Sequence, residues 1–238
     1  PATASAAEPL PALRHTSTFW QVRTSVVYEA FGLLNALTGD PLAAPQYPSE
    51  TARFVDGMTP ATQAALNRLA AYRQQSGAVL SAVLARNFSA ANPETLDAAI
   101  TLARDPRTLR QALLRADQCP GCVTMGSTDQ QEWAGFAAIL PDVAAALEYL
   151  RAAGFETYWQ EQILPGLAAS AAETQTYAQS YNIVPLIEHY LGYALPGETV
   201  TLYMVYFQRP YGHRLTGAQF VTVPGLTQAS QVQTAIHE

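Results

Sequence analysis

His237 and Glu238 form a pair that could open a metal-dependent hydrolytic site. In the helical motif H-E-x-x-H, two histidines four residues apart point to the same side of the helix and can bind one zinc ion together. The glutamate after the first histidine then lies beside the zinc-bound water and acts as its general base. We therefore expect His237 to be a zinc ligand and Glu238 the catalytic base of peptide-bond hydrolysis, with a peptide or protein as substrate.

A His-Glu pair alone is a weak signal, because it occurs by chance on many helix surfaces. Residues 228–238 form an amphipathic pattern with Val232 and Ile236 on one side, and Thr227 suits the N-cap position. No Gly, Asn or Pro ends the pattern, and Glu238 adds negative charge at the unfavourable end of the helix dipole. We expect the helix to continue in a longer parent protein, which must supply a histidine three residues after Glu238 and one further ligand.

Two β-like segments precede this helix and would position it. Residues 199–207 and 217–223 are rich in β-branched and aromatic side chains, and a turn at 209–212 separates them. Both faces of the first segment are apolar, which indicates a strand covered on both sides. We expect a β-hairpin within residues 196–238, with an extended peptide substrate bound along the edge of 217–223.

The region 15–195 has mainly helical periodicity, so the fold class is α+β, mostly α-helical, in one domain. Residues 1–14 are rich in Ala and Pro and are expected to form a flexible arm. A short strand at 19–22 leads into a helix that ends at Gly39, and Asn92 suits the N-cap of a later helix. The other predicted helices cover 60–75, 77–87, 93–104, 107–116, 129–139, 141–153, 155–164, 167–181 and 184–193.

The composition excludes several classes of protein. With 49% hydrophobic residues among 238, the chain can bury a sizeable core. Its 13 basic residues are all arginines, scattered along a chain of net charge −6, which argues against nucleic acid as a partner. The sequence contains no run of 18 apolar residues, so no membrane span is predicted. Residues 1–15 are typical of what remains after a signal peptide is removed, so we expect export to the periplasm or the outside; the alternative is a chain cut at a convenient point.

Cys119 and Cys122 form a C-x-x-C pair, for which a local disulfide is the leading interpretation in an exported protein. Free thiols, a redox pair or half of a metal site are the alternatives, but neither a surrounding βαβ unit nor a second C-x-x-C accompanies the pair. His189 on a helix is expected to be structural, His213 to lie in a surface turn, and His15 to be solvated.

Residues 20–40 resemble the opening of a group of bacterial zincin-like proteins, the DUF4932 type. The resemblance lies in an extended segment leading into a helix that carries Glu29, Leu34, Leu37 and Gly39. In that group a long helical region, a strand pair and an H-E-x-x-H helix follow, which is the order of elements expected over most of this chain. The resemblance implies a zincin-like fold and zinc as cofactor, with His237 as first ligand and Glu238 as general base.

Two other functions compete with a zinc peptidase. One is a non-catalytic exported helical protein, a binding or structural module, in which the His-Glu pair is incidental. The other is a pseudo-peptidase that keeps the fold but not the metal. The residues beyond Glu238 discriminate among the three, because only a working peptidase needs the remaining ligands.

Overall fold

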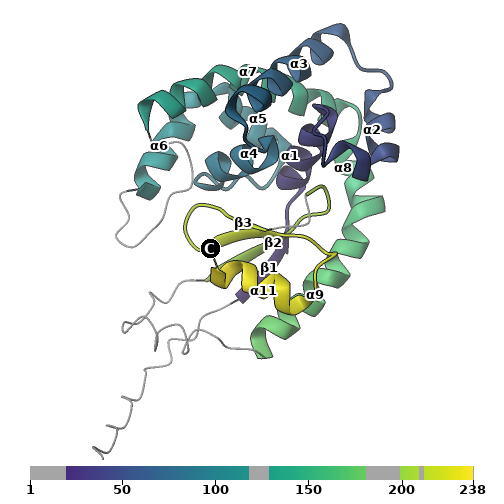
Figure 1. Ribbon diagram of the computed structural model, residues 1–238, viewed down its shortest axis with the longest axis vertical. Helices are drawn as coiled ribbons and strands as arrows, with labels where there is room; N and C mark the ends of the chain where they lie inside the picture. Colours follow the sequence, from purple (N-terminus) through teal and green to yellow (C-terminus); the bar gives the residue numbers. More distant parts are fainter. Residues whose placement is uncertain (1–19, 118–128, 181–198, 209–211, 238) are drawn as a thin grey trace, which may run out of the picture.

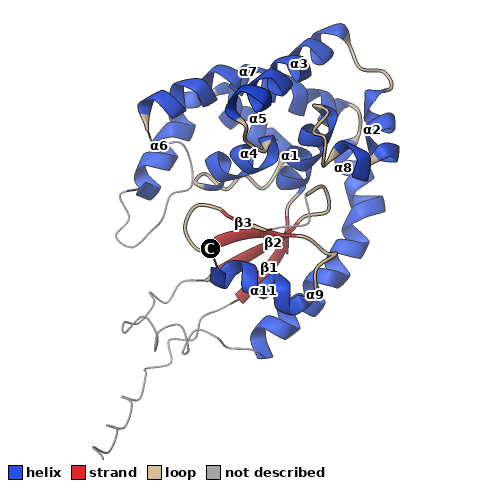
Figure 2. Cartoon of the chain, viewed as in Figure 1, coloured by secondary structure: helices blue, strands red, loops and turns tan. Residues whose placement is uncertain are grey.

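The computed structural model describes residues 20–117, 129–180, 199–208 and 212–237. The expected N-terminal arm, the Cys119–Cys122 pair, His189 and Glu238 lie outside these residues. The described part is mostly helical with one small mixed sheet, which confirms the α+β class (Figures 1 and 2).

Most of the described helices come before strand β2 in the chain, and only α11 follows the sheet. They are α1 (Val26–Leu37), η1 (Ala44–Gln46), α2 (Pro48–Val55), α3 (Pro60–Ser76), α4 (Leu80–Ser89), α5 (Leu96–Arg104), α6 (Pro106–Asp117), α7 (Gln130–Ala152), α8 (Phe155–Tyr158), η2 (Trp159–Ile163), α9 (Leu164–Ser180) and α11 (Gln228–His237). Their core is dominated by buried aromatic and leucine side chains such as Phe31, Phe88 and Phe136.

The sheet brings together strands from both ends of the chain. Its order is β1-β2-β4-β3, with β1 (Trp20–Thr24), β2 (Val200–Met204), β3 (His213–Arg214) and β4 (Gln219–Thr222). β1 and β4 both run parallel to β2, and only β3 is antiparallel to β4. The expected hairpin between residues 199–207 and 217–223 is therefore wrong, because β2 and β4 run parallel, and the antiparallel partner of β4 is β3. The expected short strand near Phe19–Val22 is real and lies at one edge of the sheet.

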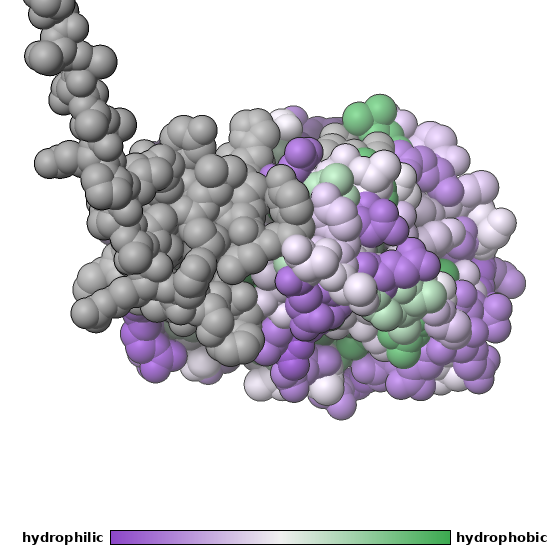
Figure 3. All heavy atoms as spheres, turned by 90° about the horizontal axis from the view of Figure 1, so that it is seen from below, coloured by the Kyte–Doolittle hydropathy of each residue, from purple (hydrophilic) through white to green (hydrophobic). Residues whose placement is uncertain are grey.

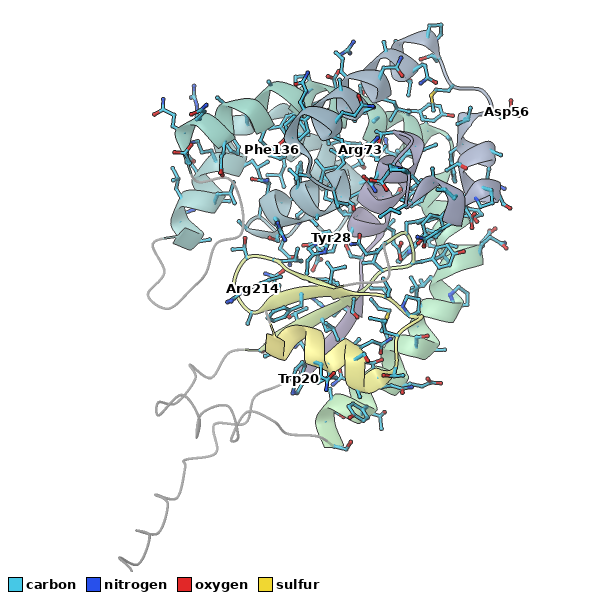
Figure 4. The ribbon with its side chains drawn as sticks, viewed as in Figure 1. Trp20, Tyr28, Asp56, Arg73, Phe136 and Arg214 are labelled. Carbon is cyan, nitrogen blue, oxygen red and sulfur yellow. The ribbon has the colours of Figure 1, made fainter. Side chains whose placement is uncertain are left out.

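Helices cover both faces of the sheet, which explains the two apolar faces of β2. The larger helical region lies against one face, where Tyr203 packs edge-on against Tyr28 with ring centroids 4.8 Å apart. On the other face α9 and α11 lie side by side, and Trp20, Ala178 and Val232 are buried together there (Figures 1 and 4). The sheet thus forms the middle layer between the helical region and α11.

Local capping explains most of the helix limits. Thr59 accepts the N–H of Thr62 with Pro60 in the first turn, and Gly77 ends α3 in the left-handed region at φ 66°. The expected cap at Asn92 is wrong, because Thr95 caps α5 and Asn92 instead adopts a left-handed φ of 45°. The expected restart at Pro141 is also wrong, since α7 runs through this proline without a break.

α7 is the one described helix that is long and apolar enough to cross a membrane by length and composition. Half of that stretch is buried inside the protein, where α7 packs against α3 and α5. Such burial is typical of the core helix of a folded domain, so no clear membrane span is found among the described residues.

The β1 edge of the sheet is closed by a side chain rather than by another strand. The amide oxygen of Gln175 accepts the backbone N–H of Val22 at 2.7 Å, and its amide nitrogen donates to the carbonyl of Trp20 at 2.8 Å. A single α9 side chain therefore provides the donor and the acceptor that a neighbouring strand would provide.

Candidate functional site

α11 carries the first candidate residue, His237, and is firmly anchored to the sheet. The hydroxyl of Thr227 accepts the N–H of Ser230 at 3.2 Å, which confirms the expected N-cap. Four residues after Thr227, Gln231 is buried and donates from its amide to the carbonyl of Val223 at 2.9 Å, while the Thr174 hydroxyl donates to its amide oxygen. These contacts hold the helix against the end of β4 and against α9.

His237 lies in the last turn of α11, as expected from the sequence. Val232, one of the two apolar residues expected on the inner side of this helix, is 1% exposed and packs against Trp20. The anchoring of α11 fixes the position of its last turn relative to the sheet. The partner of His237 in the proposed chemistry, Glu238, lies outside the described residues.

The described residues do not assemble a zinc site by themselves. Catalytic zinc takes three protein ligands and keeps one position for water. Nowhere in the described ranges do three His, Cys, Asp or Glu side chains come together in a way that could hold a metal ion. His237 thus supplies at most one ligand, and zinc binding would need donors from elsewhere in the protein.

Residues 217–223, the strand expected to bind a peptide along its edge, do not form an edge of the sheet. β4, within the predicted 217–223 strand, lies inside the sheet between β2 and β3, so both of its sides are already paired. The edge on this side belongs to β3, which consists of His213 and Arg214 (Figure 4). A two-residue strand carries too little β-pattern to be recognised from sequence, because alternation needs a longer run of residues.

His213 is a buried strand residue and not the solvated turn residue that the sequence suggested. Its side chain is 3% exposed, and its Nδ1 lies 3.4 Å from the amide nitrogen of Gln208, whose oxygen accepts the Ser81 hydroxyl at 3.2 Å. Burial, with a smaller contribution from the nearby Arg86, lowers the pKa of His213 to about 3. The imidazole is therefore neutral near pH 7, and its Nε2 has no hydrogen-bond partner among the residues that the structure describes.

Glu29 is the most perturbed carboxyl group of the described structure. Its side chain is fully buried between α1 and the segment after β2, where its two oxygens accept the backbone N–H groups of Tyr206 at 2.8 Å and Phe207 at 2.9 Å. Burial raises the pKa of Glu29 from 4.5 to about 8, although both hydrogen bonds oppose the rise. The indole of Trp159 also favours the ionised form, at a geometry outside that of a hydrogen bond.

The segment that Glu29 binds, residues 206–208, is also held in place by Tyr47. The hydroxyl of Tyr47 donates to the carbonyl of Tyr206 at 2.7 Å and lies 2.9 Å from that of Gln208. At Gly32, one turn after Glu29, a β-carbon would come within 1.8 Å of the Phe207 carbonyl oxygen. The absence of a side chain at Gly32 thus lets α1 approach the backbone closely.

Glu29 does not belong to the site expected around His237. It approaches the backbone after β2 from the helical region, whereas α11 covers the opposite face of the sheet (Figure 1). The sequence marked Glu29 only as part of a helical pattern. One signal could have shown more: a glutamate among apolar residues on every side of a helix has no solvent-facing stripe to occupy.

No known family, no curated protein and no solved structure matches this chain. The resemblance to zincin-like proteins therefore gains no support from these comparisons and stays a prediction.

Proposed function

We propose that this chain is part of an exported zinc-dependent metallopeptidase, in which His237 is a zinc ligand and Glu238 the general base. One observation carries the proposal. A helix that only five residues separate from a sheet strand, and that is anchored to that sheet through Gln231, has a histidine in its last turn followed directly by a glutamate. This is the arrangement that places a metal-bound hydrolytic centre next to a sheet.

The sheet supports the proposal by offering one edge for an extended substrate. Peptides often bind by adding a strand to a sheet edge, where main-chain hydrogen bonds give affinity. Gln175 already occupies the β1 edge, and β3 forms the other edge of the described sheet. We therefore place the peptide along β3, and no longer along residues 217–223.

Zinc would supply the electrophile and the activated water in this proposal, and His237 would hold it together with ligands that the described residues do not provide. The surface seen in Figure 3 is polar over most of its described part, with small separate apolar patches. The described part of this face therefore offers no broad apolar docking surface.

The test uses the full natural protein that contains this sequence. Zinc content is measured by elemental analysis, and cleavage is followed on an unfolded protein substrate such as casein. We expect about one zinc per chain, loss of zinc and cleavage in His237→Ala, and retained zinc but at least a hundredfold slower cleavage in Glu238→Gln. Gln233→Ala, at an exposed position on the same helix, is the matched control and should keep both zinc and activity.

The outcomes separate the competing functions. A folded protein without zinc and without cleavage would overturn the proposal in favour of a binding or structural module. If the protein is free of zinc and the residue three positions after Glu238 is not a histidine, it is a pseudo-peptidase. Zinc that stays bound in His237→Ala would show that the metal lies elsewhere.

A further inference from the structure

A cavity of about 400 Å³ opens where the first strand runs into the first helix. Residues 23–26 form one wall, the loop 92–95 before α5 forms a second, and Glu156, Trp159 and Gln160 form a third. Tyr203 of β2 completes it from the sheet. The volume is sufficient for a small molecule, and the carboxyl ends of parallel strands are a common place for ligand sites in sheets covered by helices.

The walls of this cavity carry charges of both signs. The guanidinium of Arg23 lies beside the Tyr203 hydroxyl and lowers the pKa of that phenol, partly offsetting the larger rise caused by burial. Glu94 and Glu156 come from two different walls. Arg23 and Glu94 are exposed and Glu156 is partly buried, so these charges lie at the open mouth of the cavity. A ligand that carries both a negative and a positive group would find a partner for each.

Two helices begin at the cavity and add to its positive side. Ser25 caps α1 by accepting the N–H of Tyr28, and Thr95 caps α5 by accepting the N–H of Ala98. Both capping residues line the cavity. The partial positive charge of two helix N-termini, acting together with Arg23, favours a carboxylate on this side.

Two costly backbone features also lie in the walls. Asn92 holds a left-handed φ of 45° and accepts the Tyr203 hydroxyl at 3.0 Å, which fixes its amide at the cavity. Trp159 begins a short π-helix, η2, that interrupts the run from α8 to α9. Left-handed non-glycine residues and π-helical turns each weaken a fold and are concentrated at functional sites.

We infer that this cavity binds a small zwitterion, an α-amino acid. Its carboxylate pairs with Arg23 and the N-termini of α1 and α5, and its ammonium group lies between Glu94 and Glu156. The rings of Trp159 and Tyr203 form the aromatic part of the wall, which suits a cation next to them. This site is independent of the proposed peptidase chemistry, because none of its residues belongs to α11.

Calorimetric titration tests the inference with separate solutions of L-phenylalanine, L-leucine, L-lysine and L-glutamate. Two analogues of phenylalanine complete the set: 3-phenylpropionate lacks the ammonium group, and phenethylamine lacks the carboxylate. We expect at least one amino acid to bind, and where phenylalanine binds, each analogue to bind at least about tenfold more weakly.

Variants show whether the binding belongs to this cavity. Arg23→Gln and Glu156→Gln should each weaken the amino acid by about tenfold, while Glu161→Gln, on the next turn but outside the cavity walls, should leave it unchanged. Circular dichroism confirms that each variant is folded. No binding of any of the four amino acids at about 10 mM, or binding that both Arg23→Gln and Glu156→Gln leave intact, overturns the inference. Glu238→Gln should bind as the native protein does, so failure of the peptidase proposal does not affect this result.

Discussion

The carboxylate of Glu29 accepts the backbone N–H of Phe207 at 2.9 Å, although 178 residues separate the two in the chain. Its other oxygen accepts the N–H of Tyr206, so one side chain of the first helix satisfies two donors at the end of the second strand. No salt bridge to Glu29 is found among the described residues. A fully buried carboxyl group without a cation prefers its proton, which makes the connection between α1 and β2 sensitive to pH.

Glu29→Gln should abolish a loss of stability that the native protein shows as pH rises from about 4.5 to about 8. In the native protein, the pKa of Glu29 is raised from 4.5 to about 8. Between these values the folded state holds a proton that the unfolded state has released, so stability falls as pH rises, by up to about 5 kcal/mol in total. Glutamine does not titrate, but it leaves one N–H unpaired at a cost of about 1 kcal/mol. Urea unfolding should therefore find the variant less stable than the native protein at about pH 5 and more stable at about pH 9.

Parallel pH profiles for the two proteins would contradict this prediction. Glu161→Gln is the control, because Glu161 is an exposed glutamate on η2 and its removal should leave the profile unchanged.

His213→Asn should change how stability depends on pH below about pH 6.5. The pKa of His213 is lowered from 6.5 to about 3, so between these values the unfolded state binds a proton that the folded state does not, and stability falls as pH falls. From pH 4.5 to 6.5 this slope opposes that of Glu29, and the native protein should show a plateau. The asparagine variant should lose the plateau and become less stable with rising pH across that window. A plateau that persists in the variant would show that His213 does not cause it.

Gly32→Ala should be strongly destabilising. The added β-carbon would lie 1.8 Å from the Phe207 carbonyl oxygen, and both groups belong to backbone that Glu29 and Tyr47 hold in place. We expect a loss of about 3 kcal/mol or more in urea unfolding. Gly135→Ala in α7 is the matched control: nothing lies within 4 Å of its added carbon, and the change should stabilise the helix by up to about 1 kcal/mol. Equal stability of the two variants would rule out the close approach.

Gln175→Ala should weaken the β1 edge. The change leaves the Val22 N–H and the Trp20 carbonyl without the partner that they have now, which should cost about 2 kcal/mol. Gln179→Ala, one turn further along α9 and exposed, should change stability by less than about 0.5 kcal/mol. Hydrogen exchange at Val22 gives a local readout: its amide should exchange faster in Gln175→Ala alone.

Local sequence signals predicted the helical elements well where a cap or a glycine decided the outcome. The helices predicted from residues 60 and 129 begin within one residue of these positions, capped by Thr59 and Asp129, and Thr227 caps α11 as expected. The predicted end at residue 153 agrees with the end of α7, which Gly154 follows in the left-handed region. Each of these acts through bonds within four residues, so a short window contains the whole cause. The expected fold class and the helix that carries His237 follow from such signals.

The errors arose where distant residues decide the structure. Asn92 does not cap a helix, and its side chain accepts a hydrogen bond from the Tyr203 hydroxyl, 111 positions away in the chain. α7 also continues through Pro141, where a break was expected. Nothing near β4 indicates that β2 would be its parallel neighbour, so the sequence suggested a hairpin. The burial of His213 and Glu29 also depends on elements that meet only in the folded protein, and no local pattern could show it.

The parallel pairing of Trp20 with Val200 affects how the protein is made as well as how it is built. The first strand leaves the ribosome about 180 residues before its partner, which at a typical synthesis rate is a delay of tens of seconds. During that time the helical region can form, but Trp20 has no sheet to join and its apolar surface needs protection. Folding of the central layer is therefore completed only after synthesis has passed Thr222, the end of β4, and a chain interrupted before Val200 would have its helical region without a sheet.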